Sequence, residues 1–94
     1  MKTIYLLMAR YEGLTLIPVD RIIMDYFPDM ARKTVLQKIE SGEVPLPIVR
    51  LGYGQKAQRS VDVNDLAVFL DKQAEIARKE MRKKTGSVGS GPPV

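Results

Sequence analysis

Apolar positions change their spacing along the chain, and each change predicts a new element. Residues 3–17 begin with a run of β-branched, aromatic and aliphatic side chains, pass through Tyr11-Glu12-Gly13 and continue as LTLI. This pattern predicts a short β-hairpin with its turn at Gly13. A helix over residues 4–10 stays open as the alternative, because periodicity cannot decide so short a run.

Residues 18–42 change to helical spacing, in two segments. In the first, apolar residues fall at i, i+3, i+4 and i+7, namely Val19, Ile22, Ile23 and Tyr26. Pro18 can begin this helix and Pro28 ends it. The second helix spans residues 29–42, with Asp29 as its candidate cap, Gly42 as its terminator, and an apolar stripe of Val35, Leu36 and Ile39. Two helices joined by a tight turn predict a helix-turn-helix.

Residues 43–63 cannot be helical, because Pro45 and Pro47 forbid it. They predict a strand over residues 48–51, a glycine-containing loop of about eight residues and a return strand over residues 60–63. The loop holds four basic or amide side chains, Gln55, Lys56, Gln58 and Arg59. The pattern therefore predicts a projecting basic hairpin, or wing, after the second helix.

The last helix is predicted over residues 61–84, where apolar residues repeat every three or four positions: Val63, Leu66, Ala67, Leu70, Ala74, Ala77 and Met81. Asp62 and Asp65 suit its N-terminus, and three cations suit its C-terminus. Phe69, Ile76 and Met81 are expected on its surface, so we expect a homodimer through this helix, helped by the N-terminal hairpin. Residues 85–94 are rich in Gly, Ser and Pro and predict a flexible tail after a single domain at 1–84.

Charge is unevenly distributed over the 94 residues, whose formal net charge is +4. Residues 32–59 carry six basic and two acidic side chains, and residues 78–94 carry five basic and one acidic. An acidic stretch at 60–77 separates these two basic blocks. Localised basic blocks are typical of proteins that bind polyanions, although a solvated surface explains charge alone equally well.

Few residues suited to catalysis are present. The chain has no His and no Cys, which leaves no imidazole base, thiolate nucleophile or zinc site, and we expect neither enzyme activity nor a cofactor. Asp25 and Asp29 are better explained as caps near a turn than as a catalytic pair. The apolar run at 4–8 is too short for a membrane or secretory segment. A cytoplasmic, nucleoid-associated protein is therefore expected.

Four short strings, and one long one, carry a resemblance to known proteins. Residues 34–70 resemble the helix, wing and closing helix of small excisionase-like winged-helix proteins. With LLMARY at 6–11, IPVDRI at 17–22, DYF at 25–27 and QKAQRSV at 55–61, the chain resembles the pyocin activator protein (PrtN) family of prophages and bacteriocin clusters. It departs from the broader excisionase pattern at Pro28-Asp29, where a glycine turn is usual, and at Ala31, where Ser commonly caps the helix.

The resemblance implies a DNA-binding transcriptional activator. Carried over by position, the recognition helix supplies Arg32, Lys33, Thr34, Gln37 and Lys38, and the wing supplies Arg50, Gln55, Lys56, Gln58 and Arg59. Arg and Gln suit guanine and adenine edges, whereas Lys33 and Lys38 suit phosphates. We therefore expect an α+β winged helix-turn-helix protein (excisionase- or MerR-like) that binds double-stranded DNA, with RNA polymerase as a further candidate partner and no membrane. The alternatives are an excisionase-type recombination directionality factor and a phage accessory protein that binds another protein.

Overall fold

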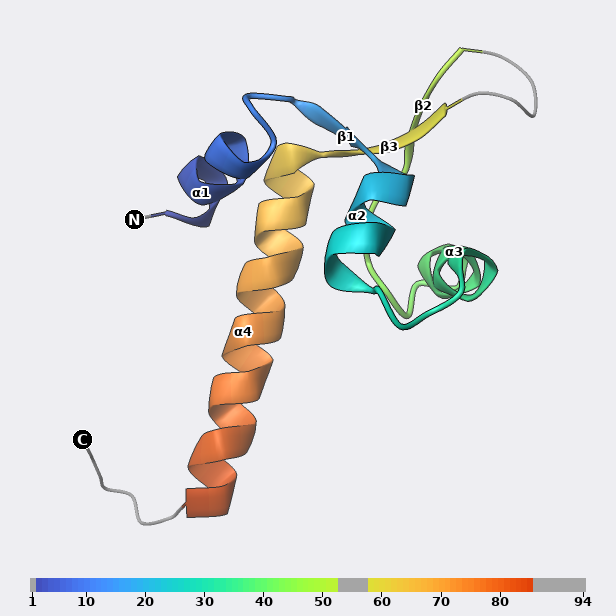
Figure 1. Cartoon of the computed structure of the whole chain (residues 1–94). Coiled ribbons are helices and arrows are strands. Elements are labelled where there is room, and N and C mark those ends of the chain that lie inside the picture. Colours follow the sequence, from blue (N-terminus) through green and yellow to red (C-terminus); the bar gives the residue numbers. More distant parts are fainter. Residues whose placement is uncertain (1, 53–57, 86–94) are drawn as a thin grey trace.

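Four helices and three short strands make up the described part of the chain. The computed structural model describes residues 2–52 and 58–85. The elements are α1 (Thr3–Arg10), β1 (Leu16–Pro18), α2 (Val19–Tyr26), α3 (Arg32–Glu40), β2 (Val49–Leu51), β3 (Gln58–Asp62) and α4 (Val63–Thr85). Figure 1 shows α1 and α3 on opposite sides of α4, whose C-terminal half projects from the body. The fold is α+β, with the long C-terminal helix that the sequence predicted.

The N-terminal β-hairpin was a wrong prediction, because residues 3–10 form helix α1. Gly13, read as a hairpin turn, instead ends the helix: Glu12 and Gly13 have φ of 55° and 79°, and the Gly13 amide donates to the Met8 carbonyl at 2.7 Å. A glycine in the left-handed region serves a turn and a helix end equally well. The helix forms because Leu7 and Tyr11, one turn apart, are both buried in the core.

Strand β3 is the centre of the small antiparallel sheet, whose order is β1-β3-β2. On one side Ile17 faces Val61, and both side chains are fully buried. On the other side β2 and β3 form the predicted wing, with Arg50 facing Arg59. Strand β2 starts one residue later than predicted and ends at Leu51 as predicted, whereas β3 starts two residues earlier and ends one residue earlier than the predicted 60–63.

Helices α2 and α3 form the predicted helix-turn-helix pair. Pro18 is the N-cap residue of α2. The side chains of Val19, Ile22 and Ile23 in this helix are buried as expected. The candidate cap Asp29 was wrong: α3 begins two residues later than that cap requires, with Ala31 at its N-cap and no side-chain cap hydrogen bond. Gly42 has a φ of 84° just beyond α3, which confirms its role as terminator.

Helix α4 closes the core with its first two turns and then leaves it. Asp62 accepts a hydrogen bond from the Asn64 amide at 2.7 Å, which stabilises the helix start. Leu66 is fully buried, and Phe69 is only 9% exposed. Phe69 was therefore wrongly expected on the surface, because it packs into the core, whereas Ile76 and Met81 are exposed as expected. None of the helices in the described ranges combines the length and apolar character that crossing a membrane requires.

Two sequence predictions lie wholly or mostly outside the described residues. They are the wing tip, with Gln55 and Lys56, and the tail, of which only Thr85 is described, as the last residue of α4.

Candidate nucleic-acid interface

Helix α3 presents a polar face to solvent. Val35 is 1% exposed, and Leu36 and Ile39 pack against the core from the same side of the helix. The opposite side is therefore turned outward, and the side chains exposed there are those of Lys33, Thr34, Gln37 and Glu40. Three of these four were predicted site residues. Glu40 was not, although its spacing of seven residues from Lys33 could have placed it on this face.

The other two predicted cations of α3 are held in ion pairs at its edges. The Arg32 Nε donates to Asp20 Oδ1, in the first turn of α2. The Lys38 Nζ donates to Glu43 Oε2 at 2.6 Å, just beyond the end of α3. Ion pairs this exposed contribute little to stability, so a polyanion can compete for both cations.

The wing brings two arginines together on one face. Arg50 of β2 lies directly opposite Arg59 of β3, and directly opposed residues point to the same face of a sheet. Neither makes an ion pair with a carboxylate among the described residues. Two like charges opposite each other repel, so this face favours an anionic partner. Gln58 pairs instead with Leu51 and belongs to the other face.

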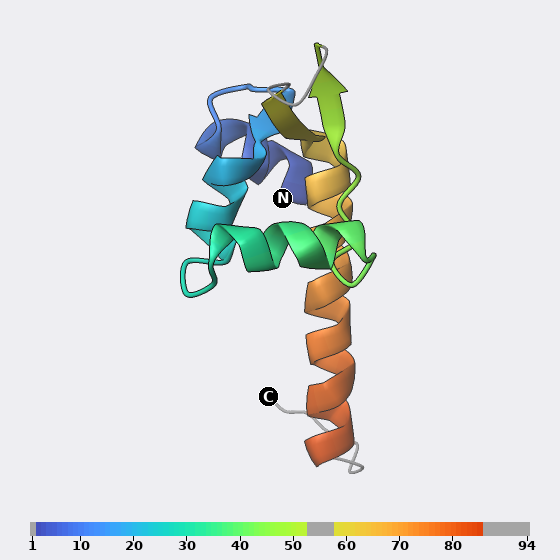
Figure 2. The same cartoon turned by 90° about the vertical axis from the view of Figure 1, so that its right-hand side faces the viewer.

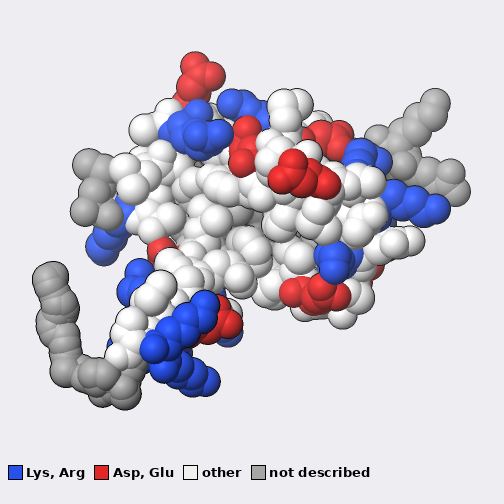
Figure 3. Space-filling view, turned by 60° about the horizontal axis from the view of Figure 1, so that its bottom comes forward, with Lys and Arg blue, Asp and Glu red and all other residues white. Residues whose placement is uncertain are grey.

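Helix α3 and the wing are visible from one side of the molecule. In Figure 2, α3 lies across the front and β2 rises above it. The second basic block of the sequence lies elsewhere, on the projecting end of α4. Seen from that end, basic side chains crowd the C-terminal part of α4, whereas acidic and basic side chains are mixed over the body (Figure 3). The two basic blocks therefore occupy separate parts of the surface.

Polar contacts join Arg10 and Tyr11, at the end of α1, to Asp25 of α2. The Tyr11 hydroxyl donates to Asp25 Oδ2 at 2.6 Å, and Arg10 Nη2 lies 3.3 Å from Asp25 Oδ1. The hydrogen bond from Tyr11, more than the nearby Arg10 charge, holds the pKa of Asp25 below its ordinary value. Burial, followed by this same hydrogen bond, raises the pKa of Tyr11. The Arg21 guanidinium also lies 4.9 Å from the centre of the Tyr11 ring, which adds a cation–π contact.

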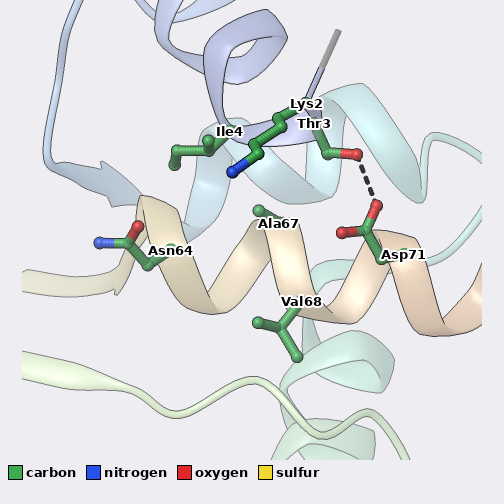
Figure 4. A pocket seen from close by; sticks show the side chains of 7 residues that line it. All are labelled: Lys2, Thr3, Ile4, Asn64, Ala67, Val68 and Asp71. Carbon is green, nitrogen blue, oxygen red and sulfur yellow. Dashed lines mark hydrogen bonds between the residues drawn. The ribbon is translucent and has the colours of Figure 1, made fainter.

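Helix α1 also contacts α4, on the side away from α3. The Thr3 hydroxyl donates to Asp71, at the edge of a shallow hollow that Ile4, Ala67 and Val68 help to line (Figure 4). With the Tyr11–Asp25 contact, this hydrogen bond joins α1 to both α2 and α4. Helix α1 is thus connected both to the first helix of the helix-turn-helix and to the closing helix.

Comparison with known proteins supplies the family. Residues 3–77 match the model of the family described as pyocin activator protein PrtN. The chain belongs to this family. The PrtN match covers α1 to the middle of α4, including α3 and both strands of the wing. No curated protein and no solved structure matches the chain significantly. Membership in a family of pyocin activators supports a role as a transcriptional activator.

Proposed function

We propose that this PrtN-family chain binds double-stranded DNA through α3 and the β2–β3 wing. In the proposal, the outward face of α3 enters the major groove, and the wing follows the adjacent phosphate backbone or reaches the minor groove. Bound in this way, the protein activates transcription of phage or bacteriocin (pyocin-like) genes, with RNA polymerase as the partner that it recruits.

The observation that carries the proposal is the Arg50–Arg59 pair on the wing, together with the polar face of α3. Opposed like charges destabilise a free sheet, so the pair is best explained by an anionic ligand that neutralises it. The outward face of α3 adds Lys33 and Gln37, which suit phosphate and adenine respectively. A short helix with polar side chains on its open face has the size and chemistry to enter a major groove.

The first test measures binding and its salt dependence. Host genomic fragments that the protein retains are identified, and the affinity of one of them is measured by fluorescence anisotropy at several salt concentrations. If six to eight basic groups contact phosphates, log affinity should fall with log salt at a slope of roughly −5 to −7. Affinity that hardly changes with salt would contradict a DNA complex dominated by the backbone.

The second test separates activation from the alternatives. The retained fragments should lie upstream of promoters, and the protein should raise transcription from them by purified RNA polymerase. A bent, multi-site footprint inside an attachment site would instead indicate a recombination directionality factor. A stoichiometric protein partner without any DNA binding at low salt would indicate an accessory protein.

A further inference from the structure

The outward face of α3 contains an acid that needs an explanation. Lys33, Gln37 and Glu40 are spaced i, i+4 and i+7, so they form one line along the exposed side of the helix, here called the α3 row. At 1.5 Å per residue this row is about 10 Å long, close to the width of a major groove. Glu40 is therefore presented to whatever Lys33 and Gln37 contact.

Glu40 differs from the two acids that pair with cations of α3. Asp20 and Glu43 each hold a cation of α3, Arg32 and Lys38 respectively. Glu40 forms no ion pair with any of the described residues. As the last residue of α3, it also lies at the negative end of the helix dipole, where an acid is unfavourable. A carboxylate at this position destabilises the helix and repels a phosphate backbone. A hydrogen bond that the carboxylate accepts from the ligand would offset these two effects.

Base edges in the major groove offer such a donor. A carboxylate accepts from the N4 amino group of cytosine, just as the amide of Gln pairs with adenine. Side chains about one helical turn apart along a recognition helix reach successive base pairs in zinc fingers. The residues of the α3 row are likewise about one turn apart. We propose that Glu40 is a specificity-determining residue that reads a cytosine in the major groove; this inference rests on the proposed function.

The test compares Glu40→Ala with Glu43→Ala, which removes the same side chain from outside the α3 row. The best duplex for the parent protein is selected from a randomised pool. Affinities are then measured for this duplex, for its single-base-pair variants and for a scrambled duplex, at one salt concentration. Glu40→Ala should reduce the ratio of specific to scrambled affinity by about 5- to 150-fold, with the loss confined to one C·G pair. Glu43→Ala should leave this ratio unchanged.

A second variant checks the chemistry. Glu40→Gln should change the preferred base at that position from cytosine to adenine, because an amide pairs with the adenine edge. Melting curves should show no loss of stability in either Glu40 variant, since the side chain is exposed and opposes the helix dipole.

The outcomes separate the inference from the proposed function. If Glu40→Ala raises specific and scrambled affinity equally, as loss of a merely repulsive acid should, the cytosine contact is wrong and the DNA-binding function stands. If the parent protein binds no duplex at all, the proposed function is wrong and the inference with it.

Discussion

Replacing Arg50 with Gln should change stability and DNA affinity in opposite directions. Arg50 and Arg59 face each other across the β2–β3 ladder, with Cβ atoms about 4.5–5.5 Å apart in such a pair. Removing one charge ends the repulsion, which we place at about 0.2–1 kcal/mol from the usual size of cross-strand pair effects. For a domain of this length, that corresponds to a rise in Tm of about 1–8 °C at low salt.

Salt provides the internal check on this rise. At about 1 M salt the Debye length falls to about 3 Å, which screens the two guanidinium groups from each other. The Tm difference between Arg50→Gln and the parent should therefore vanish in high salt. DNA affinity of the variant should fall for every sequence, and the salt slope should become shallower by about 0.9, the value for one lost phosphate contact.

The matched control is Lys72→Gln, which removes one positive charge from an exposed position on α4. It should leave both the Tm and the salt slope of DNA binding unchanged, because Lys72 faces no cation across a strand pair and lies on neither α3 nor the wing. A lower Tm for Arg50→Gln, or a rise that persists at 1 M salt, would refute the repulsion argument. An unchanged salt slope would show that Arg50 does not contact phosphate.

Two further predictions concern the scaffold and self-association. Tyr11→Phe should destabilise the fold by about 1.5–3 kcal/mol in urea titrations, since it removes a hydrogen bond to a carboxylate. Because the pKa of Asp25 is lowered on folding, its stabilising contribution is full above the ordinary carboxyl pKa and is lost as pH falls through the lowered value. In Tyr11→Phe this loss of stability in acid should be smaller than in the parent. An equal loss would contradict the view that the Tyr11 hydrogen bond lowers the pKa of Asp25. We also expect the protein to dimerise through the projecting part of α4, where Ile76 and Met81 are exposed. Met81→Glu should shift the sedimentation coefficient toward that of the monomer. A parent protein that is monomeric at high concentration would disprove the dimer.

Glu40 is a residue of the candidate site that the sequence analysis did not predict. The sequence places cations and amides on α3, and the structure puts Lys33, Thr34 and Gln37 on its exposed side. Glu40 was counted only as negative charge, although helical spacing alone aligns it with Lys33. The sequence did not predict the ion pairs of Arg32 and Lys38, because Asp20 lies on α2 and Glu43 in the turn after α3, and both distances depend on how the chain folds there.

The sequence by itself determined α2, α3 and α4, because their apolar residues recur at helical spacing and Pro18, Pro28 and Gly42 mark their limits. It also determined the wing, because the two prolines exclude helix there. It could not decide residues 3–10, where an apolar run suits a strand and a helix equally.

Only the tertiary structure decided that segment, because α1 packs against α4, Leu7 and Tyr11 are buried in the core, and the Tyr11 hydroxyl donates to Asp25 of α2. The facing of Arg50 and Arg59 was likewise decided by strand register, which depends on how β3 pairs with both neighbours at once. Both features arise from contacts between residues far apart in the chain, which local periodicity does not record.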